Sequence, residues 1–203
     1  KAIKEGLSVN ILKVISTNPN AKGLLIAQQA QIPCETISPS DYPTREDFDA
    51  ALSHTINMTP PELIVLAGFM RILTASFIDQ YPGKIINIHP SLLPKYKGLN
   101  TFQRALDNND RFHGSTVHFV IKELDAGANI GQAFVSILPN DTIETLTAKT
   151  KALEHQLLPY IISLFATKRL QFKDNRWLLD NIALPNNGIN FNEIIANHSL
   201  NRL

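Results

Sequence analysis

Two polar side chains stand together where a strongly apolar segment ends. Asn87 and His89 occur in KIINIHPSLLPKYKG, whose first residues predict a strand over 84–89. Alternate residues of a strand point to one face, so the amide and the imidazole are expected side by side. Such a pair can polarise one carbonyl group and relay one proton. A lone histidine is more often structural, but the neighbouring amide and the proline-braced exit, Pro90 and Pro94, favour a functional site.

A third polar side chain, Asp125, lies in KELDAGANI, a glycine-bearing segment between two predicted strands. Aspartate in such a segment is more often a turn former than a catalyst. It gains a role only if the fold brings it beside His89, where a carboxylate favours the charged imidazolium.

An apolar loop could form one wall of a binding site. The run ELIVLAGF, residues 62–69, predicts a strand that is covered on both faces and ends near Gly68. Ligands of open α/β sheets bind beyond the carboxyl ends of the strands. The loop from Phe69 to Leu73 could therefore wall a flat aromatic ligand, although an ordinary strand-to-helix connection made of core residues is the commoner explanation.

Several classes of protein lose support. The 19 basic and 18 acidic residues leave a net charge of +1, without the basic surface of a nucleic-acid binder. A single cysteine excludes an intrachain disulfide and a cysteine-based zinc site, and His113 and His118 have no third ligand at a suitable spacing. No apolar run approaches the roughly 18 residues of a membrane span, and no leader peptide is visible. We therefore expect a cytoplasmic protein with no metal and no nucleic-acid or membrane partner.

Strands and helices alternate along the chain, which predicts an α/β fold with an open, mostly parallel twisted sheet and helices on both faces. Asp141 is expected to cap the longest helix, with Glu144 three positions on. Strands are expected at 10–15, 34–37, 62–69, 84–89, 114–121 and 130–137, and helices at 22–30, 44–57, 74–81, 101–108 and 142–166.

No linker divides the chain, so residues 1–203 are expected to form a single domain. The segment after residue 170 is rich in asparagine, which is typical of turns. We expect a short hairpin there, and residues from about 175 to 203 as a peripheral, loosely held tail.

Four motifs, in this order and at these spacings, carry a family resemblance: LAGFMRIL, NIHPSLLPKYKGLNT, HGSTVHFV and ELDAG. They resemble the phosphoribosylglycinamide formyltransferases of purine synthesis, from about residue 2 to about residue 172. The NIHP motif is specific to the wider superfamily of formyl-transfer and formyl-hydrolysis enzymes, and the continuation SLLPKYKGLNT favours the glycinamide ribonucleotide member. The resemblance implies a Rossmann-like formyltransferase fold.

The resemblance also implies a reaction. The amine of glycinamide ribonucleotide attacks the formyl carbon of 10-formyltetrahydrofolate, the co-substrate, and no metal takes part. Asn87 and His89 match the family's oxyanion stabiliser and proton relay, and Asp125 matches the carboxylate that supports the histidine. Glu154 and Lys151 match positions that hold the ribonucleotide. The folate-binding residues that it implies are Arg45, Met70, Arg71, Ile72, Leu73, Asn87, Ile121, Lys122, Glu123, Leu124 and Asp125.

The family opens with a strand and a glycine-rich loop that binds the substrate phosphate, and Lys1 matches a position within the helix that follows. We therefore expect roughly 10–20 upstream residues, and a break in the sheet beside the strands at 10–15 and 62–67. Asn100 stands where relatives often carry a histidine, so it is given no catalytic role.

The resemblance further implies a cis peptide bond between Leu93 and Pro94. The expected partners are small-molecule substrates, and the expected state is a monomer or weak homodimer. Two alternatives remain: a 10-formyltetrahydrofolate deformylase core, in which water replaces the amine, and an inactive folate-binding relative.

Overall fold

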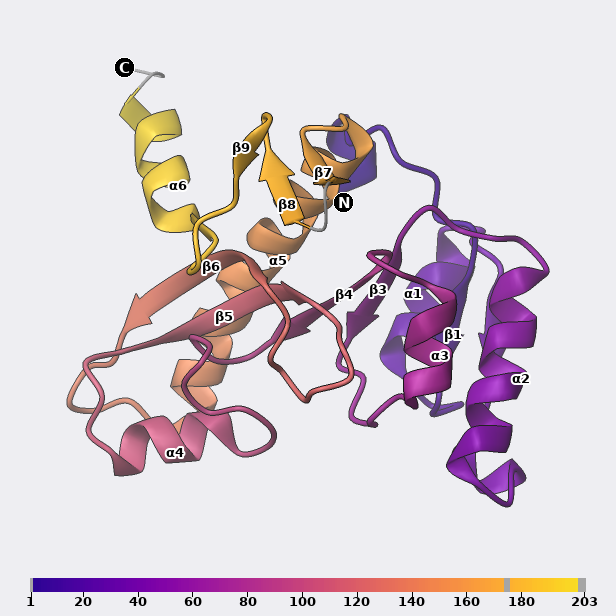
Figure 1. Cartoon of the computed structure of the whole chain (residues 1–203). Helices are drawn as coiled ribbons and strands as arrows, with labels where there is room; N and C mark the ends of the chain where they lie inside the picture. The colour runs from indigo at the N-terminus through magenta and orange to yellow at the C-terminus, as the bar shows by residue number, and fades with distance from the viewer. Residues whose placement is uncertain (1, 174–175, 201–203) are drawn as a thin grey trace.

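The computed structural model describes residues 2–173 and 176–200, and its centre is a five-stranded sheet (Figure 1). The strand order is β10-β6-β5-β4-β3. β3 pairs with β4 and β10 with β6 in parallel, whereas β5 is antiparallel to both of its neighbours. The fold is thus α/β with a sheet that contains both kinds of pairing. The strands span Ile64–Ala67 (β3), Ile85–His89 (β4), Phe112–Phe119 (β5), Asn129–Ser136 (β6) and Ile189–Asn190 (β10).

A separate two-stranded parallel sheet precedes the central one. β1 (Val14–Ser16) pairs with β2 (Cys34–Thr36), and α1 (Lys22–Gln29) connects them. Within the described residues, β1 pairs only with β2, and β3 pairs only with β4. The sheet is therefore interrupted between β1 and β3, where the sequence led us to expect a break.

Helices cover both faces of the central sheet, as expected. Ile85 and Ile86 are neighbours on β4 and point to opposite faces, because side chains alternate along a strand. Ile85 packs in a cluster with Phe48 of α2 and Phe77 of α3, and Ile86 packs in a second cluster with Leu157 of α5. Figure 1 shows α5 crossing behind β5 and β6. These helices span Arg45–Asn57 (α2), Ala75–Gln80 (α3) and Ile143–Ala166 (α5), with α4 at Thr101–Asp107 below the sheet.

Local capping explains where the helices begin, with one correction. Thr44 caps α2 as expected, because its side chain accepts a hydrogen bond from the Asp47 amide. The predicted cap of α5 was wrong: Thr142, not Asp141, is the N-cap and forms a capping box with Thr145. The Asp141 carboxylate instead accepts hydrogen bonds from the Leu138 amide, the Thr145 hydroxyl and the Lys149 ammonium group.

The C-terminal part is more firmly attached than the sequence suggested. β7 (Leu170–Lys173), β8 (Arg176–Leu179) and β9 (Ile182–Ala183) form a three-stranded antiparallel sheet, which is one strand more than the expected hairpin. β10 then joins the central sheet as an edge strand, and α6 (Phe191–Leu200) follows. Ile189 and Phe191 are buried in the main core. Residues 176–200 of the expected tail thus include strands β8 to β10 and helix α6, and residues 201–203 lie outside the described part.

One glycine permits this attachment. Gly188 has a φ of +71°, and a Cβ there would lie 2.6 Å from the carbonyl carbon of Ile130 on β6. A residue with a side chain could not bring the chain this close to β6. None of the helices formed by the described residues has the length and apolar character of a membrane span.

Candidate functional site

The antiparallel pairing of β4 with β5 sets the arrangement of the polar side chains. Asn87 lies opposite His118, and His89 lies opposite Thr116. A bulge between Val117 and His118 shifts the register of β5 against β6. Bulges re-aim side chains at the ends of strands. The site is therefore built on two neighbouring strands, and β5 contributes residues that the β4 sequence alone does not reveal.

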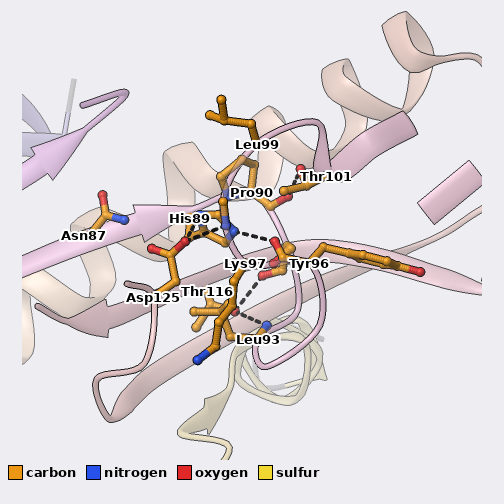
Figure 2. A network of polar contacts seen from close by, with 12 residues as sticks. Asn87, His89, Pro90, Leu93, Tyr96, Lys97, Leu99, Thr101, Thr116 and Asp125 are labelled. Carbon is orange, nitrogen blue, oxygen red and sulfur yellow. Dashed lines mark hydrogen bonds and ion pairs between the residues drawn. The ribbon is translucent and has the colours of Figure 1, made fainter. Parts of the chain in front are cut away.

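His89 is held from two sides (Figure 2). Its Nε2 lies 2.9 Å from the backbone oxygen of Tyr96, and its Nδ1 lies 3.5 Å from Oδ2 of Asp125. A carbonyl oxygen can only accept a hydrogen bond, so Nε2 carries the hydrogen. The nitrogen that can gain or lose a proton is consequently Nδ1, the one that faces Asp125.

Asp125 reaches His89 because the loop between β5 and β6 folds back onto β5. At Gly127, a Cβ would lie 1.9 Å from the carbonyl oxygen of Phe119, so only glycine allows this close approach. The Asp125 carboxylate is 8% exposed, and its Oδ2 accepts a hydrogen bond of 2.9 Å from the Gly98 amide. His89 and Asp125 lie side by side as expected, and Asn87 is connected to them through His118, whose Nε2 lies 3.6 Å from Oδ1 of Asp125.

Asn87 is oriented by a residue that sequence reasoning did not select. Its Nδ2 lies 3.2 Å from Nε2 of His118, and Nδ1 of His118 lies 2.8 Å from the Phe119 carbonyl oxygen. Nδ1 of His118 is therefore the donor, and Nε2 accepts from the Asn87 amide. The only sequence signal for His118 was its place near the end of a predicted strand. That His118 lies opposite Asn87 follows only from the pairing register of β4 and β5.

Burial keeps His118 in the neutral form that this arrangement needs. Removal of the ring from water lowers the pKa of His118, and the positive charges of His89 and Lys97 act in the same direction. The Phe119 carbonyl and the Asp125 carboxylate oppose the shift. A neutral His118 leaves one hydrogen of the Asn87 amide engaged and the other free to point elsewhere.

The loop after β4 braces both strands. The Leu93-Pro94 peptide bond is cis, as the resemblance implied. The Leu93 amide donates to Oγ1 of Thr116 over 3.1 Å, and that hydroxyl donates to the Ser91 carbonyl over 2.7 Å. The loop is thereby fixed to β5 directly across from His89.

A pocket with about 500 Å³ of empty space, open on one side, adjoins these residues. Its lining is mainly apolar and includes Asn87, His118 and Asp125, whereas His89 is not a lining residue and contacts Asp125. Arg71, Ile72 and Leu73 line it as predicted, and so does the segment from Ile121 to Asp125. The remaining lining residues are Leu66, Phe69, Ile78 and Val120.

Two predicted folate contacts lie outside this lining. Met70 is 73% exposed. The side chain of Arg45, at the start of α2, is 48% exposed and lies near Glu46. The structure brings neither of them into the pocket.

The loop from Phe69 to Leu73 forms a wall of the pocket and also contributes to the core, the two alternatives that its sequence left open. Leu73 is a core residue, whereas Arg71 and Ile72 line the pocket. Helix α2 holds this loop: the Arg71 guanidinium lies 5.2 Å from the centre of the Phe48 ring, and the buried Asp49 carboxylate accepts the Thr74 amide over 2.6 Å. The apolar wall is therefore positioned by α2 and not by the loop alone.

The predicted ribonucleotide contacts lie on α5, away from the pocket. Glu154 is half-buried and accepts a hydrogen bond from the Ser115 hydroxyl of β5. Lys151 is exposed one turn earlier on the same helix. Ser115 and His118 are both on β5, so this hydrogen bond connects Glu154 to the strand that carries His118.

A second buried histidine lies behind the site. His113 on β5 is 1% exposed and packs against Phe102 with ring centres 4.7 Å apart, and its Nε2 has no hydrogen-bond partner among the residues that the structure describes. Removal from water lowers its pKa to about 4, although a hydrogen bond to the Pro90 backbone and the nearby Asp110 partly oppose this shift. The folded protein therefore favours the neutral ring.

This shift predicts a loss of stability in mild acid. The unfolded chain binds a proton near pH 6.5 and the folded chain only near pH 4, so the stability that His113 provides is complete above pH 6.5 and is lost as the pH falls towards 4. We expect a decrease of about 2 kcal/mol in the free energy of unfolding between pH 7 and pH 5 from this residue. Urea unfolding of wild type and His113→Asn at both pH values measures it.

The exposed His155 offers the matched control. His155→Asn on α5 should leave the pH dependence of unfolding unchanged, whereas His113→Asn should flatten it. Equal slopes for wild type and His113→Asn would contradict the assignment.

Comparison with known proteins agrees with this geometry. The chain matches the formyl transferase family over residues 1–162. It is 46% identical to the phosphoribosylglycinamide formyltransferase of Haemophilus influenzae over 182 residues, which are 90% of this chain and 86% of that protein. The corresponding Escherichia coli protein is 44% identical over 193 residues, which are 93% and 91% of the two chains.

A solved structure is similar as well. The phosphoribosylglycinamide formyltransferase of Coxiella burnetii, in complex with CHES, superposes with a TM-score of 0.88 at 49% identity, and the match covers 93% of this chain and 89% of that one. The chain therefore belongs to the formyl transferase family, in the group of the phosphoribosylglycinamide formyltransferases.

Proposed function

We propose that this protein transfers the formyl group of 10-formyltetrahydrofolate to the amine of glycinamide ribonucleotide, a step of purine synthesis. The observation that carries the proposal is the chain of contacts from His89 through Asp125 and His118 to Asn87, of which Asn87, His118 and Asp125 line one largely apolar pocket. The relatives bear the name of this transferase, which supports the transferase over the deformylase alternative. The proposal includes a cytoplasmic enzyme that acts as a monomer or weak homodimer.

The pocket suits a flat, partly polar ring such as the pterin of a folate. Ligand sites commonly have apolar walls with a few polar groups, and this pocket has that character. Ile72 and Ile121 line it from two different loops. Arg45 and Met70 remain proposed contacts for parts of the folate that extend beyond the pocket.

Asn87 is proposed to stabilise the developing oxyanion. In the reaction a bond forms between the amine nitrogen and the formyl carbon, and the bond from that carbon to the folate nitrogen breaks. Negative charge develops on the formyl oxygen in between, and a preorganised N–H donor stabilises it. One hydrogen of the Asn87 amide is directed to His118, so the second is available for this oxygen.

His89 is proposed to move the proton. The attacking amine loses a proton and the leaving nitrogen gains one. A single group can accept the first proton as a base and then donate it as an acid. Nδ1 of His89 is the free nitrogen, since Nε2 donates to Tyr96. Asp125, 3.5 Å from Nδ1, lies where its negative charge stabilises positive charge on the ring. Glu154 and Lys151 are proposed to hold the ribonucleotide from α5.

A product assay tests the function. The purified protein is incubated with 10-formyltetrahydrofolate over a wide range of glycinamide ribonucleotide concentrations, and formylated product and free tetrahydrofolate are both quantified. We expect folate release only in step with formylation of the amine. Equal release without the ribonucleotide would identify a hydrolase, and no release at any concentration would identify an inactive relative.

A further inference from the structure

The loop after β4 contacts both members of the His89–Asp125 pair through residues that are two positions apart. Tyr96 accepts from Nε2 of His89 through its backbone oxygen over 2.9 Å, and the Gly98 amide donates to Oδ2 of Asp125 over 2.9 Å. Figure 2 shows the imidazole between the Tyr96 oxygen and the Asp125 carboxylate. The loop therefore holds the pair from the side opposite the sheet.

We propose that Tyr96 is a positioning residue for the reaction assigned above, on which this inference rests. Its carbonyl holds His89 in the tautomer that leaves Nδ1 free, and its side chain keeps that carbonyl in place. A second histidine rotamer or the other tautomer would turn the proton-accepting nitrogen away from Asp125. The inference thus concerns the state of His89 before any substrate binds.

The backbone conformation of Tyr96 requires such an anchor. Its φ is +55°, in the left-handed region that residues with a side chain rarely adopt. This conformation aims the Tyr96 carbonyl at His89. Uncommon backbone conformations of this kind persist where surrounding contacts enforce them, and they are frequent at active sites.

The contacts of the Tyr96 side chain stabilise this left-handed backbone conformation. Its hydroxyl donates to Oδ2 of Asp110 over 2.9 Å and accepts from Nδ2 of Asn108 over 3.1 Å. The Arg104 guanidinium lies 5.0 Å from the centre of the Tyr96 ring and donates to the Lys97 carbonyl over 2.8 Å. Helix α4 and the turn after it therefore clamp the side chain and the backbone of the loop together.

Two substitutions distinguish the effect of the Tyr96 backbone conformation from the effect of its side-chain contacts. Tyr96→Gly keeps the left-handed conformation accessible but removes the ring, and Tyr96→Phe removes only the hydroxyl contacts. We expect the turnover number of Tyr96→Gly to fall roughly 10–100-fold, since small displacements of a reacting group have effects of this size, with a smaller fall for Tyr96→Phe. The KM for the folate should change little, because Tyr96 does not line the pocket.

Nitrogen-15 NMR of the histidine side chains gives a readout that a merely structural role would not move. In wild type, neutral His89 should show one protonated nitrogen, Nε2, and one unprotonated, Nδ1. Tyr96→Gly should show a mixture of tautomers for His89 alone. The His89→Asn spectrum identifies the signals. This measurement needs no substrate, so failure of the proposed reaction and failure of this inference are distinguishable.

Gln103→Ala is the matched control. Gln103 lies on the exposed face of the same helix, α4, and donates to Asp107 over 2.6 Å, so its replacement leaves the contacts of Tyr96 with Arg104, Asn108 and Asp110 in place. Its turnover and His89 signals should remain those of wild type. A Tyr96→Gly protein with wild-type turnover and a single Nε2–H tautomer would overturn the inference, and so would a fall in melting temperature without any change at His89.

Discussion

A His89→Asn variant should turn over roughly 10²–10⁴-fold more slowly than wild type, the usual contribution of a positioned acid–base group. Asparagine can place an amide N–H where Nδ1 of the imidazole lies, next to Asp125, but it has no nitrogen that takes up a proton near neutral pH. The loss therefore falls on proton transfer and not on the architecture. Steady-state kinetics at saturating concentrations of both substrates measure the turnover number.

The fold should survive this change, because the apolar residues of β4 are untouched and His89 lies at the end of the strand. Thermal unfolding by circular dichroism should remain cooperative. His155→Asn, the same exchange at an exposed position of α5, is the control and should keep wild-type activity. A folded His89→Asn protein with near wild-type turnover would sink the assignment of the proton relay.

An Asn87→Ala variant should lose roughly 10²–10³-fold in turnover, the typical effect of removing one preorganised donor to an oxyanion. The loss should appear in the chemical step, measured in single-turnover experiments with enzyme in excess. Folate affinity, measured by calorimetry, should change little, because most of the pocket lining comes from other residues. A variant whose only defect is weaker folate binding would contradict the oxyanion role.

Asn100→Gly provides a matched control for the loss of an amide. Asn100 has a φ of +58°, which glycine adopts without strain, and its side chain makes no capping hydrogen bond to α4. We expect its turnover to match wild type. Asn87→Asp adds a second comparison: it preserves the shape of the side chain but replaces the N–H donor with an acceptor, so it should be impaired at least as strongly as Asn87→Ala.

The sequence predicts the approximate positions of β2 to β6 and of α1 to α5, but not the N-cap of α5, the third strand of the C-terminal sheet or helix α6. The apolar run at 62–69 and the segment at 84–89 became neighbouring parallel strands, and the alternation along β4 placed Asn87 and His89 on one face. Thr44 was recognisable as a helix cap. These features depend on residues that are close in the chain, so local periodicity and capping chemistry are sufficient to predict them.

The remaining residues of the site can be identified only from the three-dimensional structure. His118 orients Asn87 because the antiparallel register of β4 and β5 places it opposite, 31 positions along the chain. Tyr96 binds His89 through its backbone oxygen, and a contact of this kind cannot be predicted from a side-chain motif. The strand β10 joins β6 although its two residues carry no strand-length pattern. Strand register and loop closure are set by pairing between distant segments, and the periodicity of one segment does not name its partner.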